Sequence, residues 1–432
     1  MEESRTHYIS EALGLPAGEK VRLLGWVAVK NQVGGLVFLR IRDGSGYIQL
    51  SGRKGSIPDV AWRAASEATL ESAVCAEGAV KEDRRAPAGR EVVLSDFRIL
   101  GKAEPWPLRK SLLESPKALH DLRYLALRGP KTSAIIKVRS KLMQAVFDYF
   151  FGKGYVYIQA PTLVKAAVEG GATLFPVKYF GETAYLSQSA QLYEEAAICG
   201  VDKVFIVQPA FRAEKSRTSR HLTEFWMVEA ELAFASFQDV MKVEEELVHH
   251  MAAKVSEECG AELGRLGRKV KVPEPPFPRI SYDEAIAIAG KGGLKVEWGE
   301  DLGTEAEKLV GQAFDAPVFV TGYPVSARSF YHMSPPDNPK ITLSADLLAP
   351  GGYGELATGG QRLHDYELLA AKVREMGLDA ESMKWYMDLR RYGMPRHAGF
   401  GIGVERSLRW LLGLKHIRSA TLFPRTPSRL YP

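Results

Sequence analysis

The stretch F-R-A-E-K-S-R-T-S-R-H-L-T-E-F-W-M-V-E-A-E, residues 211–231, decides the fold of this chain. The apolar run at 204–207 before it and the residues from Phe225 onward are typical of strands. Between them lies a polar loop, residues 215–220, with three cations, three hydroxyls and no apolar residue. Two strands joined by such a loop form a hairpin that can bend over an anionic ligand. A solvated surface hairpin has the same composition, so the rest of the chain must decide between the two.

The length and composition of the chain limit the classes of protein to which it can belong. At 432 residues, with 46% hydrophobic and 25% charged residues, it is globular in composition and long enough for two domains. A net charge of +5 permits a polyanionic partner without demanding one. Three cysteines with no C-x-x-C pair indicate a reducing compartment, and no apolar run approaches the roughly 18 residues that span a bilayer. We therefore expect a soluble, cytoplasmic protein without a membrane segment or a cysteine-based metal site.

Residues 21–100 have the pattern of short strands broken by turns. A helical segment around 60–70 separates three strands from two, and Asp43 to Gly46 is a strong turn between the second and third strands. Five strands with one interposed helix predict an OB-fold β-barrel. The expected strands are residues 21–27, 36–42, 47–50, 72–80 and 91–100.

Phe38 lies in the second of these strands, with Arg40 and Arg42 close behind it. OB barrels bind single-stranded nucleic acid by stacking bases on aromatic side chains and following phosphates with cations, and this trio fits that use. The strand pattern allows equally well a Phe38 that fills the barrel interior. Both hypotheses stay open on the pattern alone.

The chain changes character after residue 103, where the barrel domain of residues 1–103 ends. Residues 104–130 are basic and irregular and are expected to form a hinge. From residue 131 the apolar period is first helical, and a second domain is predicted over 131–432. Within it, residues 262–310 contain a cluster of prolines and are predicted to be a peripheral insertion.

Three segments of the second domain resemble, in order, the signature motifs of the class II aminoacyl-tRNA synthetases. The order F-R-x-E, basic loop, R-H-L-x-E-F at 211–225 is similar to the second motif of the aspartate/asparagine/lysine subgroup in its archaeal type. The helix and strand at 132–161 resemble the first motif, and the glycine-dense strand entering a helix at 399–406 resembles the third. Residues 25–49 resemble the anticodon-binding OB domain of the same subgroup. The resemblance implies an α+β fold, an OB-fold β-barrel joined by a hinge to an antiparallel sheet flanked by helices.

The resemblance also implies a two-step ligase reaction that uses ATP and Mg²⁺. An amino-acid carboxylate attacks the α-phosphate of ATP, and the aminoacyl group then passes to the terminal ribose of tRNA. Each acid or arginine taken alone is more often a surface ion pair, but their order along the chain favours the catalytic hypothesis. The implied catalytic residues are Arg212 and Arg406, the ATP ligands Arg212, Glu214, Arg220, His221, Phe225, Glu355 and Arg406, and the Mg²⁺ ligands Asp346, Glu355 and Thr358.

The amino-acid site implied by the resemblance favours asparagine over aspartate. In the resembled aspartyl enzymes a lysine that clamps the substrate carboxylate stands where this chain has Glu194. A glutamate there repels a carboxylate but accepts a hydrogen bond from an amide. Glu229 would read the amide while Arg362 holds its carbonyl oxygen. The remaining pocket residues would be Glu169, in a glycine-rich loop that closes over the amino acid, and Gln191.

Several alternatives stay open. The segment 361–366 looks closer to aspartyl enzymes, so activation of aspartate is the first alternative. A tRNA-independent asparagine synthetase would lack the barrel, and a non-catalytic RNA-binding paralogue would be expected to lose the arginines and metal ligands. The implied partners are tRNA, held at its anticodon by Phe38 and Gln49, and a second copy of the chain in a homodimer.

Overall fold

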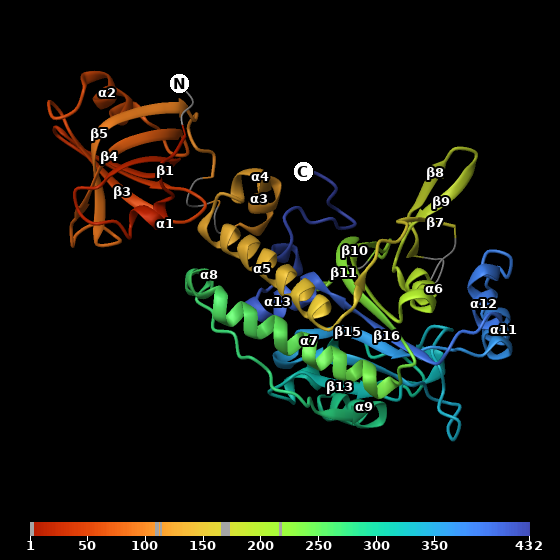
Figure 1. Cartoon of the computed structure of the whole chain (residues 1–432). Helices are drawn as coiled ribbons and strands as arrows, with labels where there is room; N and C mark the ends of the chain where they lie inside the picture. The colour runs from red at the N-terminus through yellow and green to blue at the C-terminus, as the bar shows by residue number, and fades with distance from the viewer. Residues whose placement is uncertain (1–3, 109–111, 113–114, 166–172, 216–217) are drawn as a thin grey trace. The chain divides into compact units, whose positions relative to one another are not determined.

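The computed structural model describes residues 4–108, 112, 115–165, 173–215 and 218–432. The chain forms two compact units, Met1–Pro116 and Lys117–Pro432 (Figure 1). The division between them falls inside the segment predicted to be a hinge. Among the described residues, no helix combines the length and the apolar character needed to cross a membrane.

The first unit is a closed five-stranded barrel. Side chains alternate between its interior and its surface, so Val37 and Leu39 are fully buried while Phe38 between them is only half-buried. Phe38 therefore points away from the interior, and the hypothesis that it fills the barrel is wrong. The predicted barrel with one interposed helix is confirmed. In spatial order the strands are β1 (Lys20–Val33), β2 (Leu36–Arg42), β3 (Tyr47–Arg53), β5 (Arg90–Gly101) and β4 (Ala73–Glu82), with helices α1 (Ile9–Ala12) and α2 (Asp59–Glu67).

The second unit is built on an eight-stranded sheet. Its centre is antiparallel, as predicted, and one parallel pair lies at each edge. In spatial order the strands are β12 (Arg279–Ser281), β13 (Val318–Thr321), β14 (Ser344–Ala349), β15 (Gly354–Gln361), β16 (His397–Gly403), β11 (Glu224–Ala233), β10 (Lys203–Phe211) and β6 (Val156–Tyr157). A small separate sheet has the order β7 (Leu163–Val164), β9 (Glu182–Leu186) and β8 (Pro176–Tyr179).

Helices cover one face of the large sheet and leave part of the other face open. The long helices α5 (Pro130–Gly152) and α7 (Phe237–Glu258) pack against each other (Figure 1) and, with α13 (Val404–Leu412), bury one continuous apolar core against the strands. Residues such as Val138, Val248 and Leu408 meet Val228 and Ile402 there. On the other face, α6 (Gln191–Val201) packs on β10 and β11.

The segment 262–310, predicted to be a peripheral insertion, lies at one edge of the large sheet. It supplies the edge strand β12 and the helices α9 (Tyr282–Lys291) and α10 (Thr304–Gln312). These helices form their own apolar cluster with Val318 and Val320 of β13 and Leu348 of β14. The proline cluster suggested an excursion from the fold, but the residues that follow it pack onto the sheet.

The remaining described elements are short helices and turns. They are α3 (Pro116–Asp121), α4 (Arg123–Ala126), α8 (Gly260–Leu266), α11 (Tyr366–Glu375), α12 (Lys384–Arg391) and the 3₁₀ turns η3 (Val325–Ala327), η4 (Pro350–Gly352) and η5 (Ile417–Ala420).

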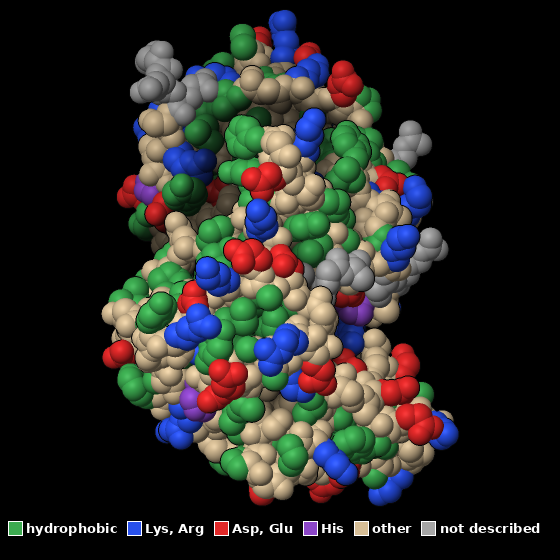
Figure 2. Space-filling model, turned by 90° about the vertical axis from the view of Figure 1, so that its right-hand side faces the viewer, with side chains coloured by type: hydrophobic (Ala, Val, Ile, Leu, Met, Phe, Trp, Pro, Cys, Tyr) green, Lys and Arg blue, Asp and Glu red, His purple; other side chains and the backbone are tan. Residues whose placement is uncertain are grey.

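The surface carries charges of both signs. Over the face shown in Figure 2, Lys and Arg side chains are interspersed with Asp and Glu, in keeping with the small net charge.

Candidate active site

Strand β11 organises the open face of the large sheet. It pairs with β10 in the predicted hairpin and with β16 on its other side. Because side chains alternate along a strand, half of its residues enter the core and half face the open side. The core residues are Val228, Ala230 and Leu232, and the open-face residues are Phe225, Met227, Glu229 and Glu231.

The glycines of β16 make room for these open-face side chains. A Cβ atom at Gly399 would lie 2.1 Å from the carboxyl carbon of Glu231, and one at Gly401 would lie 2.7 Å from Cε of Met227. Both are closer than real Cβ contacts; at Gly399 the backbone oxygen of Ala230 is also only 2.5 Å away, whereas at Gly401 the flexible end of Met227 would have to move. The glycine-dense segment of the sequence is therefore a packing requirement of the site.

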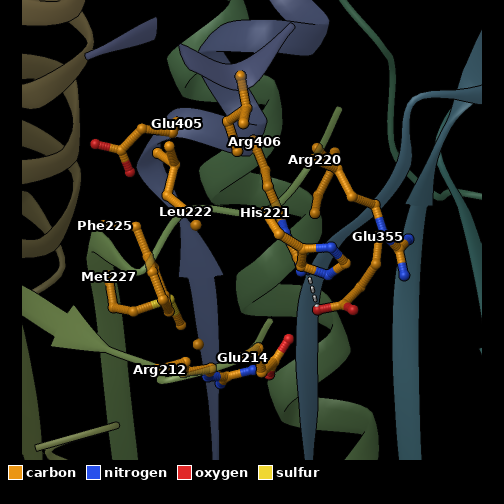
Figure 3. Close-up of a pocket in the computed structure, with 14 residues that line it drawn as sticks. Arg212, Glu214, Arg220, His221, Leu222, Phe225, Met227, Glu355, Glu405 and Arg406 are labelled. Atoms are coloured by element: carbon orange, nitrogen blue, oxygen red, sulfur yellow. Dashed lines mark ion pairs between the residues drawn. The ribbon is translucent and has the colours of Figure 1, made fainter. Parts of the chain in front are cut away.

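The open face holds two adjoining pockets. The first, the arginine pocket, is defined by Arg212, Arg220, His221, Phe225, Glu355 and Arg406 (Figure 3). The second, the glutamate pocket, is defined by Gln191, Glu194, Glu229, Glu231, Arg328 and Arg362. Arg212, Met227, Glu355 and Gly401 line both pockets. Arg212 thus stands at the junction between them.

Three arginines, three glutamates and one phenylalanine ring are among the residues that line the arginine pocket. The guanidinium carbon of Arg212 lies 5.5 Å from the centre of the Phe225 ring. Nη1 of Arg406 lies 2.7 Å from Oε1 of Glu355, the pair joined by the dashed line in Figure 3. Glu214 also lines this pocket. A planar, aromatic, anionic molecule matches this combination of ring and cations.

His221 stands beside these cations in its neutral form. Burial, followed by the neighbouring Arg406 and Arg220, lowers the pKa of His221 to about 4. Its Nδ1 lies 2.5 Å from the hydroxyl of Thr218, which holds the ring in place. At neutral pH the imidazole is therefore a neutral hydrogen-bonding group rather than a cation.

The glutamate pocket contains carboxyl groups whose positions are fixed by hydrogen bonds. Glu229 accepts from the Ser189 hydroxyl and from the backbone N–H of Ala190, the latter at 2.9 Å. Arg362 donates from Nη2 and Nε to one oxygen of Glu231, at 2.6 and 3.0 Å. The predicted pocket residues Glu229 and Arg362 are brought together, but Arg362 pairs with Glu231, which the sequence reasoning missed.

Glu194 is the most isolated carboxyl group of the glutamate pocket. It is fully buried, and within the described part of the chain neither oxygen has a hydrogen-bond partner. Burial, then Glu229 and Glu231, raise the pKa of Glu194 well above its usual value. The sequence argument treated Glu194 as an ionised group, whereas its surroundings favour the protonated form.

A buried network behind the pocket holds Gln191. Its side-chain amide donates to Oε1 of Glu195 at 3.0 Å. Glu195 also accepts from Arg390 at 2.5 Å and from Tyr386, and its Oε2 lies 3.0 Å from Nε2 of His397. The network joins α6 to α12 and β16, and no sequence signal singled it out because its members are far apart in the chain.

The three predicted metal ligands lie together on β14 and β15. The Thr358 hydroxyl donates to Oδ1 of Asp346 at 2.7 Å and lies 3.3 Å from Oε1 of Glu355. Arg328 donates to the other oxygen of Asp346 at 2.5 Å. In the described residues no group of three or more His, Cys, Asp or Glu side chains is placed to hold a metal. The donor set is therefore two carboxylates and one hydroxyl.

Arg220 has a partner that the sequence did not reveal. Both terminal nitrogens of its guanidinium contact Glu307 of α10, Nη2 at 2.8 Å from Oε1. Glu307 comes from the segment predicted to be peripheral, so spacing gave no signal for this contact. Glu231 is different, because its position two residues after Glu229 on a strand places it on the same face.

One predicted residue, Glu169, falls outside the described residues. Phe38 and Gln49 belong to the barrel, on the paired strands β2 and β3, where Arg40 is opposite Gln49. The Gln49 amide donates to Glu91 at 2.9 Å. Both side chains are half-buried on the outer surface of the barrel.

Comparisons with known families define the class of protein. The family described as tRNA synthetases class II (D, K and N) matches residues 115–427, and the OB-fold nucleic acid binding domain matches residues 21–100. The chain belongs to the class II tRNA synthetases of the D, K and N group.

Individual relatives narrow the similarity within that group. The chain is 48% identical over 418 residues to the asparagine–tRNA ligase of Thermococcus gammatolerans and 49% identical over 420 residues to that of Thermococcus kodakarensis, covering 96% of each chain. The crystal structure of asparaginyl-tRNA synthetase from Pyrococcus horikoshii complexed with asparaginyl-adenylate matches with a TM-score of 0.96 at 47% identity, over 100% of both chains. A putative aspartyl-tRNA synthetase from Leishmania major matches at 26% identity with a TM-score of 0.89.

Proposed function

We propose that this chain activates asparagine with ATP to asparaginyl-adenylate and transfers it to the tRNA for asparagine. The observation that carries the proposal is the charge of the glutamate pocket. Its described lining contains four glutamates and no lysine, and its Arg362 is already paired with Glu231. An aspartate side chain would bring a further negative charge into this buried space, whereas an asparagine amide can donate hydrogen bonds to it.

The geometry supports the following division of labour for the first step. ATP would occupy the arginine pocket with its adenine against Phe225 and its amino group at Glu214. Arg212, at the junction of the two pockets, would contact both the α-phosphate and the attacking carboxylate. Arg406 and His221 would contact the outer phosphates, and pyrophosphate leaves. Such a reaction needs position and charge stabilisation rather than a protein nucleophile.

The donor set around Asp346 fits Mg²⁺. Carboxylate and hydroxyl oxygens suit a hard cation, and Mg²⁺ keeps several waters and takes one or two carboxylates plus substrate phosphates. Asp346, Glu355 and Thr358 would hold it beside the arginine pocket. When bound, the ion would neutralise charge on the phosphate oxygens.

The remaining predicted residues would bind the side chain of asparagine or the tRNA. Glu229 would accept from the amide, Gln191 would contact the amino acid, and Glu194 and Arg362 would complete the pocket. The barrel would bind the anticodon through Phe38, by stacking, and Gln49, by hydrogen bonding. The closing role of Glu169, the homodimer and the cytoplasmic location stay predictions.

The test is ATP–pyrophosphate exchange by the full chain, without tRNA, with asparagine and with aspartate in parallel. Exchange with asparagine alone is the expected outcome, and aminoacylation of tRNA transcripts for asparagine and aspartate then checks the second step. Exchange with aspartate would show that the glutamates do not set specificity. Exchange with neither amino acid would remove the proposed activity.

A further inference from the structure

The side chain of Glu307 lies where the hairpin loop meets the sheet. Glu307 is on α10, in a segment outside the three signature motifs, and only 3% of it is exposed. Its carboxylate accepts from both terminal nitrogens of Arg220 and, through Oε2, from the backbone N–H of Glu355 at 2.9 Å. One buried carboxylate thus joins the end of the loop to the start of β15.

The backbone before Glu355 passes close to this contact. Gly354, the residue before Glu355, has φ +79°, a conformation that residues with a side chain rarely adopt. A Cβ atom there would lie 2.9 Å from Nη1 of Arg220 and 3.0 Å from Oε2 of Glu307. The glycine therefore lets the backbone that carries Glu355 run beside the ion pair.

The two ends of the contact lead to groups that face the arginine pocket. On one side Arg220 precedes His221, and the backbone carbonyl of Ser219 accepts from Ile417 at 2.9 Å. On the other side Glu355 contacts Arg406 at 2.7 Å. With both terminal nitrogens on Glu307, Arg220 serves as an anchor of the loop end in this structure (Figure 3 shows Arg220 beside Glu355).

We propose that Glu307 is a positioning residue for the ATP half of the site, acting through Arg220 and through the backbone of Glu355. It holds His221 on the loop and Glu355 on the sheet at a fixed separation, so that outer phosphates and Mg²⁺ meet a prearranged set of groups. The proposal rests on the proposed function, because it assigns ATP to the arginine pocket. It places Arg220 in a supporting role rather than as a direct phosphate ligand.

The test uses Glu307→Gln, with Glu305→Gln as the matched control on the exposed side of the same helix. The amide keeps the size of the side chain but loses its charge and turns an NH₂ group toward the donors of Arg220. We expect the KM for ATP in the exchange assay, and the Mg²⁺ concentration for half-maximal rate, to rise about tenfold, as for other partners that orient ligand groups. The KM for asparagine should change less than about twofold, because Glu307 does not line the glutamate pocket and reaches it only through the backbone of Glu355.

A purely structural role predicts a different pattern. It would lower kcat and thermal stability while leaving the ratio of the two KM values unchanged, and that result would overturn the proposal. If the Glu307→Gln chain does not fold, the KM for ATP is measured on the double variant Glu307→Met with Arg220→Met instead. Apolar replacement of both partners of a buried ion pair is tolerated better than removal of one. The ATP KM of the double variant should be about tenfold above that of the unchanged chain, as expected for loss of this contact, since the two residues act as one unit. A double variant with an unchanged ATP KM would overturn the proposal.

The same assay separates this inference from the proposed function. Absence of exchange in the unchanged chain removes the proposed function, and this inference with it. Exchange in the unchanged chain, combined with equal ATP KM values for it and for Glu307→Gln, removes the inference alone.

Discussion

The two pockets on the open face differ in their charged side chains, although one strand helps to build both. Phe225 and Met227 of β11 line the arginine pocket, and Glu229 and Glu231, further along the strand, line the glutamate pocket. The period of two decides which face a side chain occupies, and its place along the strand decides which pocket it enters. The fold thus supplies a surface, and the charges set along that surface select the ligand.

The difference extends to how the charges are held. Cations of the arginine pocket come from a hairpin loop and from the start of α13, and they lie beside open space. The carboxyl groups of the glutamate pocket are buried and rest on a network reaching α12. We infer that both pockets are preorganised, the arginine pocket by the ion pairs Arg220–Glu307 and Arg406–Glu355 and the glutamate pocket by buried hydrogen bonds.

The largest effect is expected from Arg212→Ala. Arg212 lines both pockets, so its loss removes a contact to the reacting groups themselves. We expect kcat/KM for asparagine-dependent exchange to fall about 1,000-fold, the cost of a preorganised group that stabilises developing charge. The control is Arg374→Ala on the exposed surface of α11. A loss below tenfold for Arg212→Ala would show that the junction of the pockets is not the reaction centre.

Glu195→Gln should damage the support of the glutamate pocket. Breaking a buried ion pair leaves Arg390 uncompensated, so we expect a loss of about 3 kcal/mol in the free energy of unfolding. Urea denaturation of the full chain measures it, with the exposed Glu375→Gln as control. An unchanged midpoint would show that the network carries no stability.

The ion pair between Glu195 and Arg390 should also make the free energy of unfolding depend on pH in the acid range. Burial raises the pKa of Glu195, but the Arg390 guanidinium and the His397 contact outweigh burial and hold that pKa below its usual value of 4.5. A depressed carboxyl pKa gives stability that is present above the unfolded pKa and is lost as pH falls below it. The unchanged chain should therefore lose stability below about pH 4.5 more steeply than Glu195→Gln. Parallel curves for the two proteins would contradict this.

Glu194→Lys should place a positive charge in the glutamate pocket. The new ammonium would lie near Glu229 and Glu231 and compete for the groups that meet the amide. We expect kcat/KM for asparagine to fall about 100-fold, the usual cost when buried polar groups meet the wrong partner. Exchange assays with both amino acids, alongside Glu194→Gln, measure the effect. Asparagine activity within threefold of the unchanged chain would show that Glu194 does not face the substrate.

The smallest effect is expected from Glu194→Gln. Burial raises the pKa of Glu194 well above its usual value, so its contribution to stability is complete below the unfolded pKa and is lost as pH rises toward the folded one. An amide has no proton to lose, so the variant should be more stable than the unchanged chain at pH 8, by about 1 kcal/mol. Thermal unfolding at pH 6 and pH 8 checks this, and equal stability differences at the two pH values would contradict it.

The local parts of this structure could be predicted because they depend on near neighbours in the chain. The hairpin over 204–231, the five barrel strands and the glycine-dense strand each carry a period or a turn signal in a few residues. For the same reason, Arg212, Phe225 and Glu229 could be placed on one hairpin. Glu231 could have been placed in the same way, because it follows Glu229 by two residues on one strand and so shares its face.

By itself, the sequence determined which residues alternate on a strand, which faces are apolar and which class of enzyme the motifs resemble. Only the tertiary structure decided the partners. Arg220 meets Glu307 across 87 positions, Arg362 meets Glu231 across 131, and Arg390 meets Glu195 across 195. Periodicity acts over a few residues, whereas these ion pairs form where distant segments cross on the sheet. The cost of burying these charged side chains is offset only where both partners meet in the folded chain. The raised pKa of Glu194 and the contact between Arg220 and Glu307 therefore depend on the tertiary structure.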